Sequence, residues 1–205
     1  MAKNGSINAT DDVTGDMPSE DAANGVEASD EGLMERVAKG DRVAYAILVK
    51  RHANRFLAMA ERILGNRQEA EDQVQHAFTR LWVHAAQFNP QTARFSTWFY
   101  KIVTNACTDH LRKKKTVPLA QGWDAEDGAL RADKKIEQAE QNEALRQALM
   151  GLSQRQRIAI TLCYFDELSN HEAARIMGTS IKALESLLVR GRVALRQILA
   201  EDQSA

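Results

Sequence analysis

The sequence contains little cysteine and no long hydrophobic run. Its two cysteines, Cys107 and Cys163, both lie in apolar helical patterns without clustered histidines beside them. Such a pair is a poor basis for a zinc site, and we expect two reduced core thiols in a cytoplasmic protein. No stretch of about 18 apolar residues is present, so we expect no transmembrane helix and no membrane insertion. The polar N-terminus lacks a hydrophobic signal segment, so secretion is not expected.

Sequence signatures of common enzyme classes are also missing. The chain has no glycine-rich phosphate loop, no nucleophile elbow and no metal-ligand spacing. His110 follows Asp109, but neighbouring side chains on a helix point about 100° apart and do not form a catalytic pair. We therefore expect a protein without enzymatic activity, cofactor, metal or small-molecule substrate.

Charge is distributed unevenly along the chain, although the formal net charge is only −1. Residues 1–31 carry one basic and eight acidic side chains, and residues 33–115 carry fifteen basic and seven acidic ones. The basic block suggests a polyanionic partner such as nucleic acid. The acidic segment has few large apolar residues and cannot bury enough surface to offset its ordering entropy. We therefore expect residues 1–31 to form a disordered acidic tail.

From Gly32 onward, apolar residues recur at helical spacing, which indicates an all-α fold. Gly40 and Asp41 fit a helix end followed by a new N-cap, and the next helix should end at Gly65. Asn66 then starts a third helix with one strongly apolar face. Four polar side chains fall on the opposite face of that helix, namely Asp72, Gln75, His76 and Thr79.

The stretch over residues 93–115 joins an aromatic start to a basic end. Asn89 and Pro90 predict a turn before it, and Ser96 is the expected N-cap of its helix. Trp98 lies at the border of the apolar face. The polar face and the basic end carry Asn105, Asp109, Arg112 and Lys113.

A second helical unit is expected to begin near Asn142. Residues 116–141 hold a proline, two glycines and many charges, which is typical of a flexible linker. The sequence therefore predicts two small helical domains, at 32–115 and 142–205, joined by this linker.

The second unit contains a helix, a short glycine turn and another helix. Ser169 and Glu172 match a capping box, Gly178 permits a tight turn, and Ser180 can cap the following helix. An αα-hairpin with no role on DNA is the alternative, but the positions of the caps and of the glycine favour a helix-turn-helix. Its second helix would expose Lys182, Glu185, Ser186, Val189 and Arg190 to a major groove.

Three stretches, in this order, resemble bacterial RNA polymerase sigma factors of the extracytoplasmic-function (ECF) type. AEDQVQHAFTRLW resembles the region-two helix that grips core polymerase. FNPQTARFSTWFYKIVTNACTDHLRKKK resembles the segment that opens and reads the minus-ten element. LSQRQRIAITLCYFDELSNHEAARIMGTSIKALESLLVRGRVALR resembles region four, which reads the minus-thirty-five element. The resemblance covers about residues 32–199.

The resemblance implies a promoter-specificity subunit that binds core RNA polymerase and promoter DNA and helps to melt the DNA. The implied polymerase contacts are Asp72, Gln75, His76 and Thr79. The implied minus-ten contacts are Asn89, Arg94, Phe95, Trp98, Asn105, Asp109, Arg112 and Lys113, with the loop from Asn89 to Phe95 as the pocket for a flipped base. The implied minus-thirty-five contacts are Ser180, Lys182, Ala183, Glu185, Ser186 and Arg190.

The chain departs from the family pattern at several positions. His76 stands where an acid is commoner, Ser153 replaces a proline, and Glu185 and Leu187 replace commoner basic residues. The resemblance also implies an anti-sigma partner. The alternative is a helix-turn-helix regulator with a helical dimerisation domain, which, unlike a sigma factor, would not copurify with core polymerase.

Overall fold

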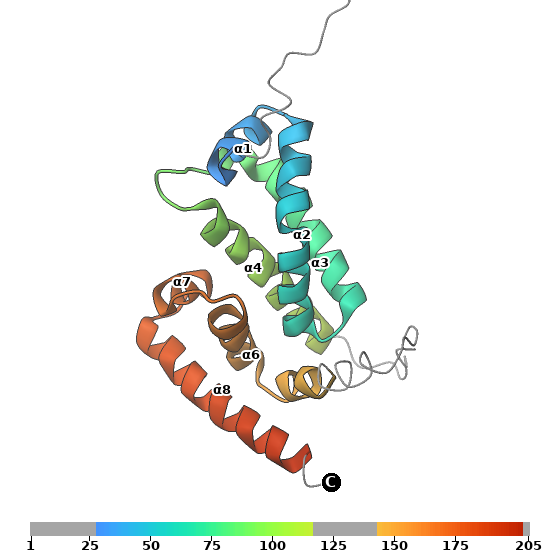
Figure 1. The fold of residues 1–205 in the computed structure, drawn as a ribbon, viewed down its shortest axis with the longest axis vertical. Coiled ribbons are helices and arrows are strands. Elements are labelled where there is room, and N and C mark those ends of the chain that lie inside the picture. Colours follow the sequence, from blue (N-terminus) through green and yellow to red (C-terminus); the bar gives the residue numbers. More distant parts are fainter. Residues whose placement is uncertain (1–27, 117–142, 203–205) are drawn as a thin grey trace, which may run out of the picture.

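The computed structural model describes residues 28–116 and 143–202, which we name the first and second modules (Figure 1). The first module contains α1 (Asp30–Ala38), α2 (Arg42–Leu64), α3 (Arg67–His84), the 3-10 turn η2 (Ala85–Gln87) and α4 (Phe95–Thr116). The second contains a helix over 143–150, α6 (Gln154–Ile160), the π-helical turn η3 (Thr161–Phe165), α7 (Asn170–Ile176) and α8 (Ile181–Asp202).

Across these two ranges every regular element is helical, which confirms the expected all-α fold. None of the helices within them is both long and apolar enough to cross a membrane. Nearly all of the expected acidic tail, at 1–27, and of the expected linker, at 117–142, lies outside the described residues.

Several predicted helix ends are confirmed. The Asp41 carboxylate accepts hydrogen bonds from the amides of Val43 and Ala44, at 2.8 and 3.0 Å, and so caps α2. Gly65 ends α2 in the left-handed region, with φ of 73°, and Asn66 caps α3. Asparagine and aspartate at these positions satisfy amides that have no partner inside the helix.

Two helix starts differ from the prediction. α1 begins at Asp30 and not at Gly32, because the Ser29 hydroxyl accepts a hydrogen bond from the Gly32 amide at 3.1 Å. α4 begins at Phe95, so Ser96 is not its N-cap. The Phe95 amide donates to the Glu31 carboxylate at 3.0 Å, so α1 supplies the cap that the local sequence lacks.

An aromatic cluster fills the core of the first module. The ring of Phe99 lies 4.6 Å from that of Phe56 on α2, 4.8 Å from that of Phe78 on α3, and 5.6 Å from that of Phe95. All four side chains are buried. Such ring pairs add to the free energy of burial, so this cluster fixes α4 against α2 and α3.

The helix-turn-helix of the second module is formed by α7 and α8. Ser169 and Glu172 make the expected capping box at the start of α7, and Gly178 turns the chain with φ of 59°. The Ser180 hydroxyl accepts a hydrogen bond from the Ala183 amide at 3.2 Å at the start of α8. Gly191 lets α8 approach α6 closely, because a Cβ atom there would lie 3.1 Å from Ile160.

The two modules are in contact. α7 lies beside α4 (Figure 1), and η3 lies beside α2. Arg55 donates a hydrogen bond to the backbone oxygen of Asp166 at 3.1 Å. The Arg62 guanidinium lies 4.6 Å from the centre of the Phe165 ring. Arg146 donates to the Gly65 backbone oxygen at 2.9 Å.

We expect Phe99→Ala to lower the free energy of unfolding of the first module by about 3–5 kcal/mol, because it leaves a cavity among three other rings. Denaturant unfolding followed by circular dichroism measures the change. Val83→Ala is the control, since the Val83 side chain is exposed and its loss should change stability by less than about 0.5 kcal/mol. Equal effects of the two substitutions would contradict the central place of Phe99.

Candidate nucleic-acid and partner surfaces

The polar face predicted on α3 is exposed. Asp72, Gln75, His76 and Thr79 are all exposed, and Val74 and Phe78 on the other side of the helix are buried. The sequence periodicity therefore separated the two faces of α3 correctly.

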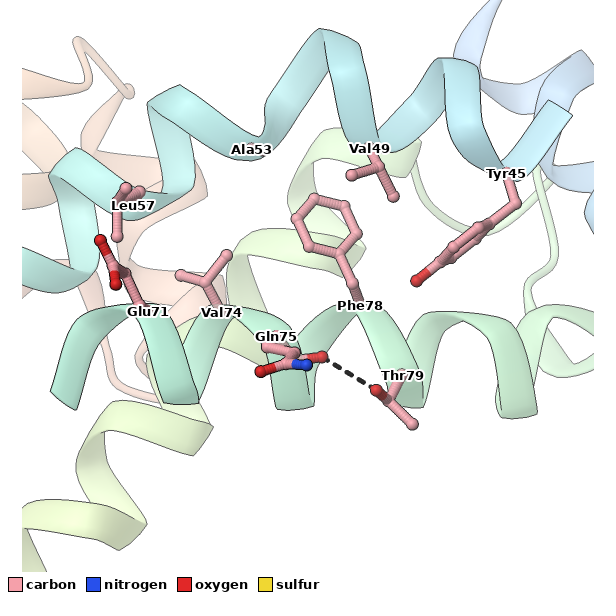
Figure 2. Close-up of a pocket in the computed structure, with 9 residues that line it drawn as sticks. All are labelled: Tyr45, Val49, Ala53, Leu57, Glu71, Val74, Gln75, Phe78 and Thr79. Carbon is pink, nitrogen blue, oxygen red and sulfur yellow. Dashed lines mark hydrogen bonds between the residues drawn. The ribbon is translucent and has the colours of Figure 1, made fainter. Parts of the chain in front are cut away.

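A groove of about 360 Å³ lies beside this face, between α2 and α3 (Figure 2). Its lining residues are Tyr45, Val49, Ala53, Leu57, Glu71, Val74, Gln75, Phe78 and Thr79. Gln75 and Thr79 thus belong both to the polar face and to the groove, and the Thr79 hydroxyl donates to the Gln75 backbone oxygen at 3.0 Å (Figure 2). An apolar recess with a polar border has the make-up of a protein interface.

The loop before α4 is shaped by Asn89. Its side-chain oxygen accepts a hydrogen bond from the Gln91 amide at 2.9 Å, and its backbone oxygen accepts one from the Thr92 hydroxyl at 3.0 Å. This local turn chemistry holds the loop, whose last residue, Arg94, is exposed. Asn89 therefore has a structural role in the loop.

Phe95 does not face the surface as a base-contacting residue would. Its side chain has no exposed area, stacks on Phe99 with an interplanar angle of 14°, and lies 5.1 Å from the ring of His52. The expectation of a direct DNA contact is therefore corrected, because the ring supports the loop from the core. Trp98 is half-buried, with its ring 5.4 Å from that of Phe88.

The basic end of α4 is paired with carboxylates. Arg112 forms an ion pair with Asp109 at 3.0 Å, and Lys114 forms one with Glu69 of α3 at 2.6 Å. His110 lies 3.0 Å from the same Glu69 carboxylate. Burial opposes ionisation of Glu69, but Lys114 and His110 outweigh it and hold its pKa below the usual value. This end of α4 is thereby tied to the start of α3.

The start of α8 presents the predicted recognition face. Ser180, Lys182, Ala183, Glu185, Ser186 and Arg190 are all exposed. Leu184 and Leu188 are buried behind them, and Arg190 donates to the Ser186 backbone oxygen at 3.2 Å. Leu187, which departs from the family pattern, is also buried, so at that position the chain has an apolar core residue.

A polar cluster between the modules has no signal in the sequence. The Asp166 side chain is only 4% exposed and lies 4.0 Å from Arg62, and the Arg55 guanidinium lies 5.3 Å from the Tyr100 ring centre. Burial raises the pKa of Asp166 to about 6, although Arg55 and Arg62 act in the opposite direction. These residues come from distant parts of the chain, so no local pattern connects them.

Comparisons with protein families match both modules. The model for sigma-70 region 2 matches residues 48–117, and the model for sigma-70 region 4 matches residues 142–195. The chain is 33% identical to the ECF RNA polymerase sigma factor SigW of Bacillus subtilis, over 82% of this chain and 95% of that protein. It is 31% identical to the ECF RNA polymerase sigma-E factor of Escherichia coli K12, over 82% and 92%.

Solved structures of similar fold exist as well. The structure of CnrH in complex with the cytosolic domain of CnrY superposes with a TM-score of 0.64 and 28% identity, over 85% of this chain and 99% of that one. The sigma factor RpoE in complex with the anti-sigma factor NepR, from Bartonella quintana, superposes with a TM-score of 0.60 and 23% identity, over 74% and 94%. The second likeness supports the fold alone.

The raised pKa of Asp166 predicts a pH dependence of stability. Because the folded protein binds this proton more tightly than the unfolded chain, the contribution is complete below pH 4 and is lost as pH rises through 6. Asp166→Asn cannot ionise and so does not show this loss, and its stability relative to the unchanged protein should rise by about 2 kcal/mol between pH 4.5 and 7.5. Denaturant titrations at both pH values measure this.

Asp72→Asn is the control for this experiment, since Asp72 is exposed and its substitution should have the same effect at both pH values. If the stability difference between Asp166→Asn and the unchanged protein were the same at both pH values, the assigned pKa of Asp166 would be wrong.

Proposed function

The chain belongs to the extracytoplasmic-function family of RNA polymerase sigma factors, and we propose that it serves polymerase and promoter through three surfaces on its two modules. As a sigma factor it is the promoter-specificity subunit that binds core RNA polymerase and initiates transcription. The observation that carries the proposal is that three polar sets, each named from the sequence, lie on α3, on α4 with the loop before it, and on α8, and that the other sides of these helices are buried.

The first surface is the α3 face with its groove, and it binds core polymerase. Asp72, Gln75, His76 and Thr79 supply the polar contacts, and the recess between α2 and α3 takes apolar side chains from the partner. Burial of such a recess supplies most of the binding free energy, and the polar rim supplies specificity.

The second surface is the loop before α4 together with the polar face of α4, and it holds the minus-ten element. Asn89, Arg94, Trp98, Asn105, Asp109, Arg112 and Lys113 make up this surface. Base flipping costs a few kcal/mol, and stacking on an aromatic ring returns about 1–3 kcal/mol per base. Trp98 is half-buried and leaves part of its ring available for stacking. Phe95 acts from beneath by supporting the loop.

The third surface is the start of α8, and it reads the minus-thirty-five element. Ser180, Lys182, Ala183, Glu185, Ser186 and Arg190 make up this surface. A recognition helix enters the major groove with its N-terminal residues toward the base edges, which is where these side chains lie on α8. Arg190 lies farthest along the helix, and a bidentate contact with guanine is the chemistry it offers.

The same function sets the domain assignment, the localisation and the further partner that we propose. We assign the polymerase and minus-ten surfaces to residues 32–115 and the minus-thirty-five surface to residues 142–205, in a cytoplasmic protein that performs no catalysis itself. An anti-sigma factor is a further proposed partner. Its support is that CnrH, 28% identical to this chain, was solved in complex with the cytosolic domain of CnrY.

Substitution of the α3 face tests the polymerase surface. We expect Asp72→Arg with Gln75→Ala to leave folding intact, because both side chains are exposed, and to weaken binding to core polymerase at least about tenfold, or 1.4 kcal/mol. Titration of labelled protein with core enzyme measures the affinity. Glu35→Arg with Gln87→Ala makes the same chemical changes at two other exposed positions and should bind normally. If both double variants bound core polymerase equally well, the assignment of the α3 face to core polymerase would be wrong.

Separate substitutions test the two DNA surfaces. Arg190→Ala should weaken binding of holoenzyme to closed duplex promoter by about 1–3 kcal/mol if the side chain contacts a base edge. Arg94→Ala should leave that binding nearly unchanged and impair strand opening, because the loop acts on an unpaired base. Filter binding on duplex promoter and permanganate footprinting of the opened strands measure the two steps.

Two controls separate the role of Arg190 in duplex binding from that of Arg94 in strand opening. Arg192→Ala removes an exposed arginine about 200° further round α8 and should bind duplex normally. A template with a pre-melted bubble should restore activity to Arg94→Ala and not to Arg190→Ala. The assignment fails if Arg190→Ala binds duplex normally, or if Arg94→Ala binds closed duplex as poorly as Arg190→Ala.

A further inference from the structure

The loop before α4, over residues 88–94, carries hydrogen bonds of its own. The backbone oxygen of Asn89 accepts from the amides of Thr92 and Ala93, at 3.1 and 3.3 Å, and its side-chain oxygen accepts from the Gln91 amide at 2.9 Å. These bonds join residues within the loop, so they set its shape but not its position on the first module. The position of the loop must therefore come from the contacts that hold its ends.

Glu31 of α1 holds the end of the loop that leads into α4. Arg94 is the residue before this helix, and its backbone oxygen accepts a hydrogen bond from the Trp98 amide at 3.1 Å. The amide of Phe95 donates to the Glu31 carboxylate at 3.0 Å. Carboxylates are favourable at helix N-termini because the first amides have no partner inside the helix. Glu31 thus fixes the peptide group that joins the exposed Arg94 to α4.

Asp30 holds the start of α1 against α2 and so keeps Glu31 in place. The Asp30 carboxylate forms an ion pair with Arg51 and lies 2.9 Å from Nε2 of His52. The His52 ring in turn lies 5.1 Å from the ring of Phe95, where α4 begins. The contacts form a closed circuit, from α2 to α1 through Asp30, from α1 to α4 through Glu31, and from α4 back to α2 through the two rings.

This circuit restrains the point where the loop meets the helix. A binding site requires that its contacting groups be held within about 0.5 Å of the productive geometry by supporting residues. Phe95 and Glu31 have the properties of supporting residues, because the Phe95 ring has no exposed area and the Glu31 carboxylate binds a backbone amide. Arg94 lies beside them, is exposed, and is the side chain whose backbone they hold.

We propose that Glu31 is a positioning residue for strand opening, which holds the loop before α4 through the Phe95 amide and thereby presents Arg94 to the unpaired strand. This role rests on the proposed sigma function. Glu31 lies outside the loop and outside the polar face of α4, and its role requires no contact with DNA. The role does require an acceptor oxygen at this position, so glutamine can replace Glu31 and alanine cannot.

The first test follows promoter opening by holoenzyme, with permanganate footprinting of the opened strands. Glu31→Ala should slow opening at least about fivefold, the factor that corresponds to the loss of a typical helix cap. Glu31→Gln should open within about twofold of the unchanged protein, since its amide oxygen accepts the same hydrogen bond. Glu35→Ala removes an exposed carboxylate about one turn further along α1 and should open normally.

Binding to core polymerase and to closed duplex promoter should stay within about twofold for Glu31→Ala, because only the end of the loop is released. Normal opening by Glu31→Ala would overturn the proposal. Opening by Glu31→Gln as slow as that by Glu31→Ala would also overturn it, because charge and not the acceptor oxygen would then matter. A loss of duplex binding as large as the loss of opening would do the same, since Glu31 would then act on the whole module.

The second test measures the hydrogen bond in the free protein and needs neither polymerase nor DNA. By NMR, Glu31→Ala should raise the hydrogen-exchange rate of the Phe95 amide at least about fivefold, and Glu31→Gln should raise it less than about twofold. The Phe99 amide, about one turn into α4, is the internal reference, and its exchange rate should change less than about twofold. An equal rise at Phe95 and Phe99 would overturn the proposal, because Glu31 would then stabilise α4 as a whole.

The two tests distinguish failure of this role from failure of the proposed function. Faster exchange at Phe95 together with normal promoter opening would refute the positioning role and leave the sigma function intact. If the unchanged protein opened no promoter, the sigma function would be wrong and the positioning role with it, whatever the exchange rate at Phe95.

Discussion

The packing of Phe99 sets the rotation of α4, and the surfaces of the first module follow from that rotation. Its ring lies among those of Phe56, Phe78 and Phe95, so this side of α4 must face the core. Adjacent residues on a helix point about 100° apart. Trp98 is therefore turned to the rim, against Phe88, and Tyr100 toward Arg55 at the boundary with the second module. Three successive aromatic residues thus have three different structural roles.

Features determined by neighbours in sequence were predictable. Asp41 caps α2, Gly65 ends it, and Ser169 with Glu172 caps α7, because each acts on amides or torsion angles within a few residues. The exposed faces of α3 and α8 were predictable for a similar reason, since a period of 3.6 residues separates buried from solvated positions. The assignment of these faces to polymerase or DNA came from family resemblance, because a solvated polar face has no shape that identifies its partner.

Features determined by distant residues were not predictable. The cap of α4 comes from Glu31, 64 residues away, so a search for a local cap pointed to Ser96 instead. Phe95 lies one residue before Ser96, the predicted N-cap. Periodicity over a single helical turn does not distinguish an exposed aromatic side chain from a buried one. Asp166 meets Arg55 across 111 residues and the linker, and neither periodicity nor composition connects such a pair.

The same distant contacts change how the basic block meets DNA. Arg112 pairs with Asp109 and Lys114 pairs with Glu69. A DNA phosphate that binds one of these paired cations must displace a protein carboxylate. The net release of ions on binding is then smaller than when the phosphate binds a solvated lysine. Non-specific DNA affinity is thereby lower than the fifteen basic side chains of residues 33–115 would give if all of them were solvated. The same cost applies to specific binding, because both modes use phosphate contacts, so preference for a promoter must come from contacts with the bases.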